Sequence, residues 1–287
     1  MRWMQDAPMG ERRPMPTAQA EAIGRSRYDY ARAWAVNAHH YEAQGLYRRL
    51  ASLLTEHGVP HSLIDLGCGT GEGLAAMRAA MPPHARLWGL DENPACLAAA
   101  TARLAPVERL AVRPAAADGY DLLYHPAETG GEAPVALIHS DLLRPDPGFA
   151  ETIALAGPVD AMTLWFTGTH GAREDDRLIA THRLCSDELY GLAVELTGLG
   201  LAGDWLRPGG LFQLVGRAAH PDDATILTAF RARLLGLAEH LPLSLIALDL
   251  VPYTEPAGGG AMLVAQDRSS APPARTVAVS AIFRRDS

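Results

Sequence analysis

Glycine recurs at every second position from Gly67 to Gly73, directly after an apolar run and before an alanine-rich helical segment. Glycine tolerates positive φ angles and lets a ligand approach the backbone closely. The turn also leads into a helix, and the free N–H groups of a first helical turn point toward whatever lies against it. The spacing therefore predicts a binding turn that excludes side chains next to its ligand.

Phosphate ligands fit this turn poorly. A Walker-type phosphate loop needs Gly-Lys followed by Ser or Thr, and the chain contains no lysine. The dinucleotide pattern GxGxxG fails in the frames that begin at Gly67 and Gly69, and the frame at Gly71 begins too late after Leu66, where the strand ends. Glu72 at the helix start would also repel a pyrophosphate. A nicotinamide-dependent oxidoreductase is therefore a weaker alternative.

Carboxylates stand at the ends of three predicted strands, and they are Asp65, Asp91 and Asp141. Because the carboxyl ends of parallel strands meet at one edge of a sheet, we expect these acids to line the same edge as the glycine turn. Taken alone, Asp91 could be a helix cap, since Asn93 and Pro94 follow it, and Asp141 could cap a turn. In combination with the glycines they favour a small-molecule site.

The elements that must position these residues alternate along the chain. Strand patterns are predicted at 62–66, 87–90, 135–139, 159–166, 211–215, 243–251 and 276–283. Helix patterns are predicted at 71–81, 94–104, 147–155, 188–199 and 222–240, the last with Asp222 as its cap. This alternation indicates an α/β fold with a mostly parallel sheet and helices on both faces. No helix separates the last two strands, so they are expected to pair antiparallel.

Three organisational units are predicted. Residues 1–20 lack periodicity and are expected to form a flexible arm, whereas 21–60 carry apolar and aromatic residues at helical spacing and are expected to form a helical lid. Residues 61–287 form the main domain. Insertions near 107–132, 167–186 and 252–275 interrupt the alternation, and such segments tend to lie at a sheet rim, where specificity is built.

Composition limits the partners. The 287 residues carry a net charge of -8, which disfavours a general grip on nucleic acid. No apolar run reaches the roughly 18 residues of a membrane span, so no membrane partner is expected. Cys68, Cys96 and Cys185 form no CxxC pair, which favours a reducing cytoplasm. A homodimer is compatible with the sequence.

The segment Asp65-Leu66-Gly67-Cys68-Gly69-Thr70-Gly71 resembles the first motif of class I S-adenosylmethionine (SAM)-dependent methyltransferases. Ser140-Asp141-Leu142 and Arg207-Pro208-Gly209-Gly210 are similar to two later features of that family, in the same order. The resemblance implies a Rossmann-like fold with a seven-stranded, mostly parallel sheet whose last strand is antiparallel. It also implies SAM as the cofactor and a methyltransferase activity, EC 2.1.1.

Individual roles follow from the same resemblance. The glycine turn would pack against the methionine and ribose, Asp65 would help hold the α-amino group, and Asp91 would accept hydrogen bonds from both ribose hydroxyls. Asp141 would contact the adenine amino group. The predicted cofactor residues are Asp65, Gly67, Cys68, Gly69, Gly71, Asp91, Glu92, Asp141 and Leu142.

Residues for the methyl acceptor are less distinctive. The stretch Leu164-Trp165-Phe166-Thr167-Gly168-Thr169-His170 lacks the Asn/Asp-Pro-Pro-aromatic motif of methyltransferases that act on amino groups of DNA bases or protein glutamine. Trp165 and Phe166 could form an apolar wall or belong to the core, and His170 could be a general base or an ordinary loop residue. No HxH or HExxH spacing exists, so no metal is predicted.

Two further groups of residues could bind the substrate. The predicted N-terminal helix carries Tyr28, Tyr30, Trp34, His40 and Tyr41, which could line an acceptor pocket or form a core stripe. Glu188 and Glu195 are two helical turns apart, in a segment faintly similar to the double-glutamate segment of arginine methyltransferases. They could clamp a guanidinium group, or they could belong to a solvated helix face.

The leading functional hypothesis is methyl transfer to an O, N or C nucleophile of a small molecule in a biosynthetic pathway. One alternative is a SAM-binding regulatory or partner subunit without transferase activity. Another is a guanidino or amino N-methyltransferase that uses Glu188 and Glu195. A methyltransferase for a macromolecule is weakened because the chain lacks a basic surface or an added binding domain.

Overall fold

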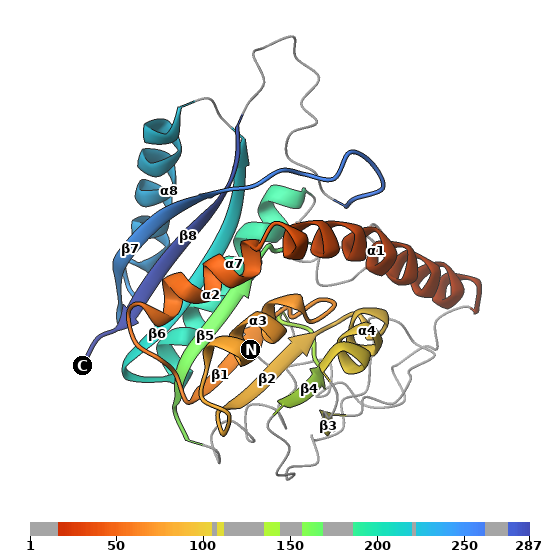
Figure 1. Ribbon diagram of the computed structural model, residues 1–287, viewed down its shortest axis with the longest axis horizontal. Coiled ribbons are helices and arrows are strands. Elements are labelled where there is room, and N and C mark those ends of the chain that lie inside the picture. Colours follow the sequence, from red (N-terminus) through yellow and green to blue (C-terminus); the bar gives the residue numbers. More distant parts are fainter. Residues whose placement is uncertain are drawn as a thin grey trace, which may run out of the picture.

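A single mixed sheet forms the centre of the molecule, with helices on both of its faces (Figure 1). The computed structural model describes residues 17–104, 108–111, 135–143, 157–168, 186–219, 222–261 and 275–287. Its strands are β1 (Ser62–Leu66), β2 (Arg86–Asp91), β3 (Glu108–Ala111), β4 (Val135–His139), β5 (Val159–Trp165), β6 (Leu206–Ala219), β7 (Leu243–Pro252) and β8 (Thr276–Arg285). Its helices are α1 (Thr17–Ala43), α2 (Leu46–Thr55), α3 (Glu72–Ala80), α4 (Pro94–Leu104), α7 (Asp187–Trp205) and α8 (Asp223–Ala238).

The strand order is β3-β4-β2-β1-β5-β6-β8-β7. All neighbours from β3 to β6 pair parallel, and β8 runs antiparallel to both β6 and β7. The predicted fold class is confirmed, since the seven predicted strands are present and one of them runs against the others. The structure adds β3, a short strand beside β4, in the segment that was predicted only as an insertion near 107–132.

Burial on both faces explains why the central strands read as continuous apolar runs. Four of the five residues of β1 are buried, and neighbouring side chains enter different cores. Leu63 packs into the core beneath α2, α3 and α4, whereas Ile64 packs into the core beneath α7 and α8. A strand buried in this way shows no polar alternation, as is typical of parallel sheets covered by helices.

Element ends differ from the prediction at β6. The predicted turn at 207–210 belongs to this strand, because Leu206 lies opposite Val159 and Leu211 lies opposite Ala161, so that the intervening residues bulge. Gly209 has a φ of 79° there. On the other side, Asp222 caps α8 as predicted and accepts from the N–H groups of Ala224 and Thr225. The helix predicted at 147–155 lies outside the described residues.

Helix α1 crosses above the carboxyl ends of the strands (Figure 1). The described helix begins at Thr17, while residues 1–16 of the predicted arm lie outside the described ranges. The side chain of Asn37 fastens α1, since its amide donates to the carbonyl of Ala261 at 2.7 Å and accepts from the N–H of Ala261 at 3.0 Å. Near the end of α1, Gln44 makes a similar exposed pair of bonds with Thr254. The division into arm, lid and main domain stays a prediction.

Asn37→Ala should lower the free energy of unfolding by about 2–4 kcal/mol. Asn37 is fully buried, and alanine would leave both backbone groups of Ala261 without partners, each at a cost of roughly 1–3 kcal/mol. Gln44→Ala is the matched control, because its bonds to Thr254 are exposed and water can replace them. Chemical denaturation would measure both variants, and equal losses would contradict the role of Asn37 as the main fastening.

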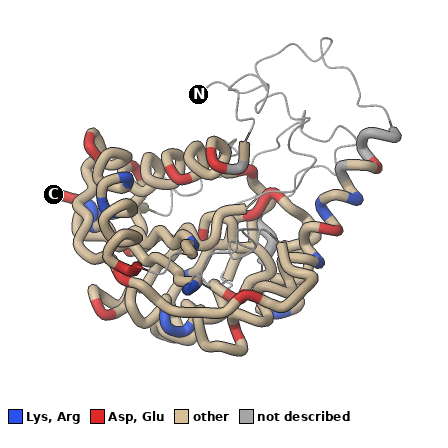
Figure 2. The backbone as a smooth tube through the Cα atoms, turned by 90° about the horizontal axis from the view of Figure 1, so that it is seen from above, with Lys and Arg blue, Asp and Glu red and all other residues tan. Residues whose placement is uncertain are grey.

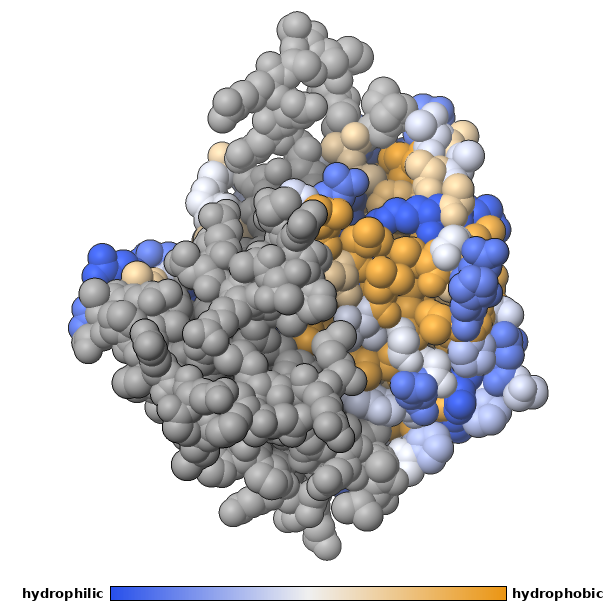
Figure 3. Space-filling view, turned by 180° about the vertical axis from the view of Figure 1, so that it is seen from behind, coloured by the Kyte–Doolittle hydropathy of each residue, from blue (hydrophilic) through white to orange (hydrophobic). Residues whose placement is uncertain are grey.

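The described surface is mixed in charge and partly apolar. Acidic and basic residues are interspersed along the backbone, with no continuous basic face in the described part of the chain (Figure 2). Seen from behind, hydrophobic residues gather on one area (Figure 3), and the exposed apolar side chains include Leu189 and Leu196 of α7 and Leu235 of α8. Among the described helices, none combines the length and apolarity that a membrane crossing needs. The homodimer and the cytoplasmic location stay predictions.

Candidate functional site

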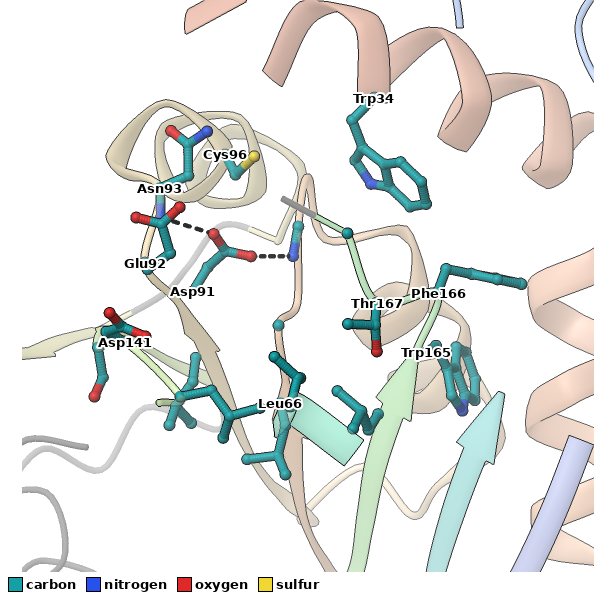
Figure 4. Close-up of a pocket in the computed structure, with 18 of the residues that line it drawn as sticks. Trp34, Leu66, Asp91, Glu92, Asn93, Cys96, Asp141, Trp165, Phe166 and Thr167 are labelled. Carbon is teal, nitrogen blue, oxygen red and sulfur yellow. Dashed lines mark hydrogen bonds between the residues drawn. The ribbon is translucent and has the colours of Figure 1, made fainter. Parts of the chain in front are cut away.

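A cavity lies at the carboxyl edge of β1, β2, β4 and β5, with α1 above it (Figure 4). Its empty volume is about 730 Å³, part of which is open to solvent. The cavity brings together many of the residues predicted from the sequence, namely Tyr30, Trp34, Gly67, Gly69, Asp91, Glu92, Asp141, Leu142, Trp165 and Phe166. Residues distant in the sequence therefore meet because parallel strands end at a common edge.

The glycines of the turn differ in what a side chain would contact at each position. Gly67 has a φ of 74°, and a Cβ added there would meet nothing within 4 Å. At Gly69 an added Cβ would stand 2.9 Å from Nε1 of Trp34, and at Gly71 it would stand 3.1 Å from the backbone of Ala100. Gly69 and Gly71 thus serve close packing within the protein, and Gly67 is the position that leaves room for a ligand.

Asp91 ties the glycine turn to the turn after β2. Its carboxylate accepts from the N–H of Gly69 and from the N–H of Asn93, each at 2.8 Å, as the dashed lines in Figure 4 show. Burial is the main cause that raises the pKa of Asp91 to about 7, and the nearby charge of Glu92 adds to the rise. Each carboxylate oxygen can accept more than one hydrogen bond, so both retain capacity for a ligand hydroxyl.

Asp65 lies beneath the turn and does not line the cavity. Its side chain is 4% exposed and accepts from Oγ1 of Thr163 at 2.7 Å. Burial raises the pKa of Asp65 to about 7, and the bond from Thr163 opposes that rise. Asp65 therefore lies behind the turn, and its role in holding the α-amino group, directly or through water, stays a prediction. Its side chain points under the start of α3, where its Oδ2 lies 3.5 Å from the Cβ position of Gly73.

Cys68 and Gly71 do not line the cavity, and their contact with a cofactor stays a prediction. Cys68 is buried, and its sulfur lies 3.0 Å from the Cβ position of Gly89 on the neighbouring strand β2. Gly71 packs against α4, with Ala100 and Leu104 as its nearest neighbours. Both residues set the spacing between the turn, β2 and α4.

The turn between β2 and α4 also holds α1. Glu92 forms an ion pair with Arg27 at 3.1 Å, and the amide of Asn93 donates to the carbonyl of Arg27 at 2.9 Å. Asn93 caps α4 at the same time, because its side-chain oxygen accepts from the N–H of Ala95 at 3.0 Å. Sequence reasoning treated Asn93 only as part of a helix start. The sequence feature that marks Asn93 is the Asn-Pro pair that follows closely after an acid at a strand end.

Asp141 closes the far end of the cavity, at the end of β4 (Figure 4). It is 5% exposed, and its Oδ1 accepts from the N–H of Leu143 at 3.0 Å. The carboxylate therefore caps its own turn, and the residue also lines the cavity next to Leu142, while its contact with a cofactor stays a prediction.

Trp165 and Phe166 form a wall at the other end of the cavity (Figure 4). Trp165 also belongs to the core, since its indole N–H donates to Gln213 at 3.1 Å and its ring stacks on Tyr47. Phe166 has a φ of 57°, and it is the one non-glycine residue with a positive φ among the described residues. Strained backbone of this kind clusters at functional sites.

The remaining predicted residues have other places. Tyr28 is 57% exposed, with the guanidinium of Arg32 over its ring. His40 bonds to Oγ1 of Thr254 at 3.1 Å, and Tyr41 is fully buried among aromatic rings. None of these three lines the cavity, and their contact with a substrate stays a prediction. His170 lies outside the described residues.

Neither glutamate of the predicted pair lines the cavity. Glu188 is exposed, and Glu195 forms an ion pair with Arg233 of α8. The charge of Glu195 is therefore already compensated within the protein. The same helix instead supplies Tyr190 and Val194 to the cavity, which sequence reasoning missed. Their spacing of four residues placed them on one face, but nothing in the sequence showed that this face meets the site. No cluster of metal-ligating side chains occurs in the described ranges.

Comparison with known proteins gives distant matches. No model of a protein family and no curated protein matches the chain. The N-methyltransferase NodS from Bradyrhizobium japonicum WM9, in complex with S-adenosyl-L-homocysteine, is 12% identical, with a TM-score of 0.49 over 94% of this chain and 99% of that chain. The plantazolicin methyltransferase BpumL, also in complex with that compound, is 11% identical, with a TM-score of 0.46 over 94% of this chain and 98% of that chain.

TrmN from Thermus thermophilus is 14% identical, with a TM-score of 0.45 over 84% of this chain and 48% of that chain. This chain therefore spans about half the length of TrmN. Each of the three TM-scores lies below 0.5, so these matches describe distant likenesses in the course of the backbone, and the function proposed next rests on the residues of the site.

Proposed function

We propose that this protein binds SAM in the cavity above the glycine turn and transfers its methyl group to a small molecule. The observation that supports this most is that Asp91 and Gly67 line the same cavity. A partly buried carboxylate with free acceptor capacity and the glycine position that leaves open space both belong to its wall. This pair suits a ligand with ribose hydroxyls, and the family resemblance of the glycine turn points to SAM.

The residues present fit this cofactor. Asp91 would accept from the ribose hydroxyls, and Asp141 and Leu142 at the far end would hold the adenine. Leu66 and Leu90 supply apolar surface between these ends. The volume of about 730 Å³ lies within the range of about 300–1,000 Å³ that is typical of small-molecule sites. Asp65 would act from behind the turn, through its negative charge.

When bound, SAM supplies a methyl carbon that accepts an electron pair from the acceptor while its bond to sulfur breaks, which leaves S-adenosylhomocysteine. The protein has to align the acceptor with that carbon and keep water away. Trp34, Trp165 and Phe166 would do the second task with apolar rings at one end of the cavity. Burial raises the pKa of Tyr30, so this cavity residue would remain a protonated donor at neutral pH. The role of His170 as a base stays a proposal.

The alternatives differ in what the site should contain. A SAM-binding partner subunit would need no acceptor space, whereas this cavity continues past Asp91 to the aromatic wall (Figure 4). A guanidino N-methyltransferase with Glu188 and Glu195 is weakened by the ion pair between Glu195 and Arg233. We therefore favour an acceptor that packs against the aromatic wall, and we propose that it belongs to a biosynthetic pathway.

Binding of S-adenosylhomocysteine should become about tenfold tighter between about pH 6 and about pH 8 for each carboxyl group that must be ionised. Asp65 and Asp91 have a pKa of about 7 in the folded protein, above the value of about 3.9 in an unfolded chain. Between about pH 3.9 and about pH 7, the folded state therefore binds more protons than the unfolded chain. The contribution of Asp65 and Asp91 to the free energy of unfolding is lost as the pH rises through about 7. A ligand with hydroxyl donors and an ammonium group favours the ionised carboxylates. Calorimetry in buffers of different ionisation enthalpy would detect the released protons, and a flat affinity profile would contradict this coupling.

The proposed function is tested in two steps. Calorimetry should show that SAM and S-adenosylhomocysteine bind while NAD and NADP do not. Incubation with SAM carrying a labelled methyl group and a metabolite extract should then transfer the label to a small molecule. Binding of a pyridine nucleotide in place of SAM would overturn the proposal, and SAM binding without any labelled product would favour the partner-subunit alternative.

A further inference from the structure

Arg217 places a positive charge next to the aromatic wall of the cavity. It lies on β6 two residues beyond Val215, which pairs with Trp165 of β5. Its guanidinium carbon is 5.8 Å from the centre of the Trp34 ring. Since Trp34 lines the cavity, Arg217 stands directly behind the cavity wall, beneath α1.

Around Arg217 lies an aromatic cluster, formed by Trp34, Tyr41, Phe166 and Tyr253. The ring centres of Tyr41 lie 6.4 Å from Trp34, 5.6 Å from Phe166 and 5.0 Å from Tyr253. Two members, Trp34 and Phe166, line the cavity. The cluster is therefore continuous with the acceptor end of the site. Arg217 and Tyr41 do not line the cavity themselves, so a ligand group reaches them only when it displaces one of these two rings.

Two polar atoms in this region are buried without a hydrogen-bond partner, and they are Nη1 of Arg217 and the hydroxyl of Tyr41. No carboxylate in the described ranges lies within ion-pair distance of Arg217, although the guanidinium is close enough to Tyr41 to oppose the rise of its pKa. Buried polar atoms in folded proteins almost always have partners, and each exception costs about 1–3 kcal/mol. The pair therefore indicates a missing acceptor.

The guanidinium can only donate, and the hydroxyl of Tyr41 can donate as well as accept. An arginine guanidinium carries five N–H donors and stays charged. Burial raises the pKa of Tyr41, so its hydroxyl keeps its proton at neutral pH. The partner that satisfies both is a group with several acceptor lone pairs and a negative charge.

A carboxylate fits better than a phosphate. The cluster holds one cation, and Glu255 lies close enough to raise the pKa of both Tyr41 and Tyr253. Glu255 already offsets part of the charge of Arg217, so the cluster accommodates one added negative charge better than the two of a phosphate monoester. The planar guanidinium also matches the two oxygens of a carboxylate.

Building on the proposed function, we infer that the methyl acceptor is an organic carboxylate. Its carboxylate group is bound by Arg217 and the hydroxyl of Tyr41, and its apolar body lies against Trp34 and Phe166. This assigns a substrate class to the acceptor end of the site and gives two residues outside the cofactor end a role in acceptor binding.

The test uses the full chain saturated with S-adenosylhomocysteine and pairs of probes that differ in charge alone. Aryl- and alkyl-carboxylates such as 4-phenylbutyrate would be compared with their amides by ligand-observed NMR and calorimetry. At least one carboxylate should bind about tenfold more tightly than its amide, and Arg217→Gln should abolish the difference. Arg231→Gln is the matched control, because Arg231 is exposed on α8. Acetate should compete with the probe better than inorganic phosphate does.

Tyr41→Phe keeps the buried ring and removes only the hydroxyl, so it tests the inference even if Arg217→Gln fails to fold. This substitution should lower the affinity for the carboxylate probe by about threefold to tenfold and leave the affinity for its amide unchanged. Equal affinity for carboxylates and amides in the natural protein would overturn the inference, as would stronger competition by phosphate than by acetate. Absence of S-adenosylhomocysteine binding in the natural protein would instead refute the proposed function, so the two failures are distinguishable.

Discussion

Asp91→Ala should weaken the binding of S-adenosylhomocysteine by on the order of 100-fold. The proposed ribose contact consists of two hydroxyl groups that donate to a partly buried carboxylate, and a hydrogen bond to a charged group contributes roughly 1.5–3 kcal/mol. Alanine also releases the N–H groups of Gly69 and Asn93, so the glycine turn loses its link to the turn after β2. Calorimetry at about pH 8, where the carboxylate is ionised, would measure the loss.

Two controls separate binding from folding. Asp204→Ala removes an exposed carboxylate of α7 and should leave affinity and stability unchanged. Asp91→Asn keeps the shape of the side chain and one acceptor oxygen, so it should fold better than Asp91→Ala. It should still bind S-adenosylhomocysteine weakly, because its NH₂ group would face donor groups that the carboxylate now accepts from. If Asp91→Ala bound S-adenosylhomocysteine with the affinity of the natural protein, the ribose would lie elsewhere and the proposed site would be wrong.

Gly67→Ala and Gly71→Ala should differ in how much stability and how much ligand affinity each variant loses. Both glycines have positive φ, which costs an alanine about 1–2 kcal/mol. At Gly71 the new methyl would also press on the Cα and Cβ of Ala100, at 3.1 and 3.0 Å, and overpacking of this kind adds about 1–3 kcal/mol. Gly71→Ala should therefore lose about 2–5 kcal/mol of stability, whereas Gly67→Ala should lose only the backbone contribution.

Binding should show the opposite order at the same two positions. The methyl of Gly67→Ala would enter the open space of the cavity, so affinity for S-adenosylhomocysteine should fall by at least tenfold in a protein that remains folded. The folded fraction of Gly71→Ala should keep an affinity close to that of the natural protein. Denaturation curves and calorimetry on both variants would check the pair. Normal binding by Gly67→Ala would mean that no ligand approaches the turn there.

Local patterns were enough to predict most of the fold. The apolar run of β1, the acid at the end of β2 and the absence of a helix before β8 each report on their own segment and its neighbour. The start of β6 was missed because turn residues such as Gly209 stand in a bulge opposite Val159, so the strand continues through them. A bulge depends on the partner strand, and a single segment carries no trace of its partner.

The site was predictable where the chemistry follows from a strand end, and not where it follows from packing. Asp91 and Asp141 reach the cavity because their strands end there. The glycine pattern could not show that Gly69 is required by Trp34, which is distant in the sequence. Arg217 and Tyr190 were missed for the same reason, since their place depends on how β6 and α7 pack.

The fastening of α1 has a consequence for the order of assembly. Asn37 and Ala261 are 224 positions apart, and Gln44 and Thr254 are 210 positions apart. Contacts across such distances bear a large loop-closure entropy, and during synthesis the later partner leaves the ribosome long after the helix does. The glycine turn and its acid at Asp91 lie within one βαβ unit and can form early. A nascent chain would thus form the glycine turn and its bond to Asp91 before α1 is fastened above them.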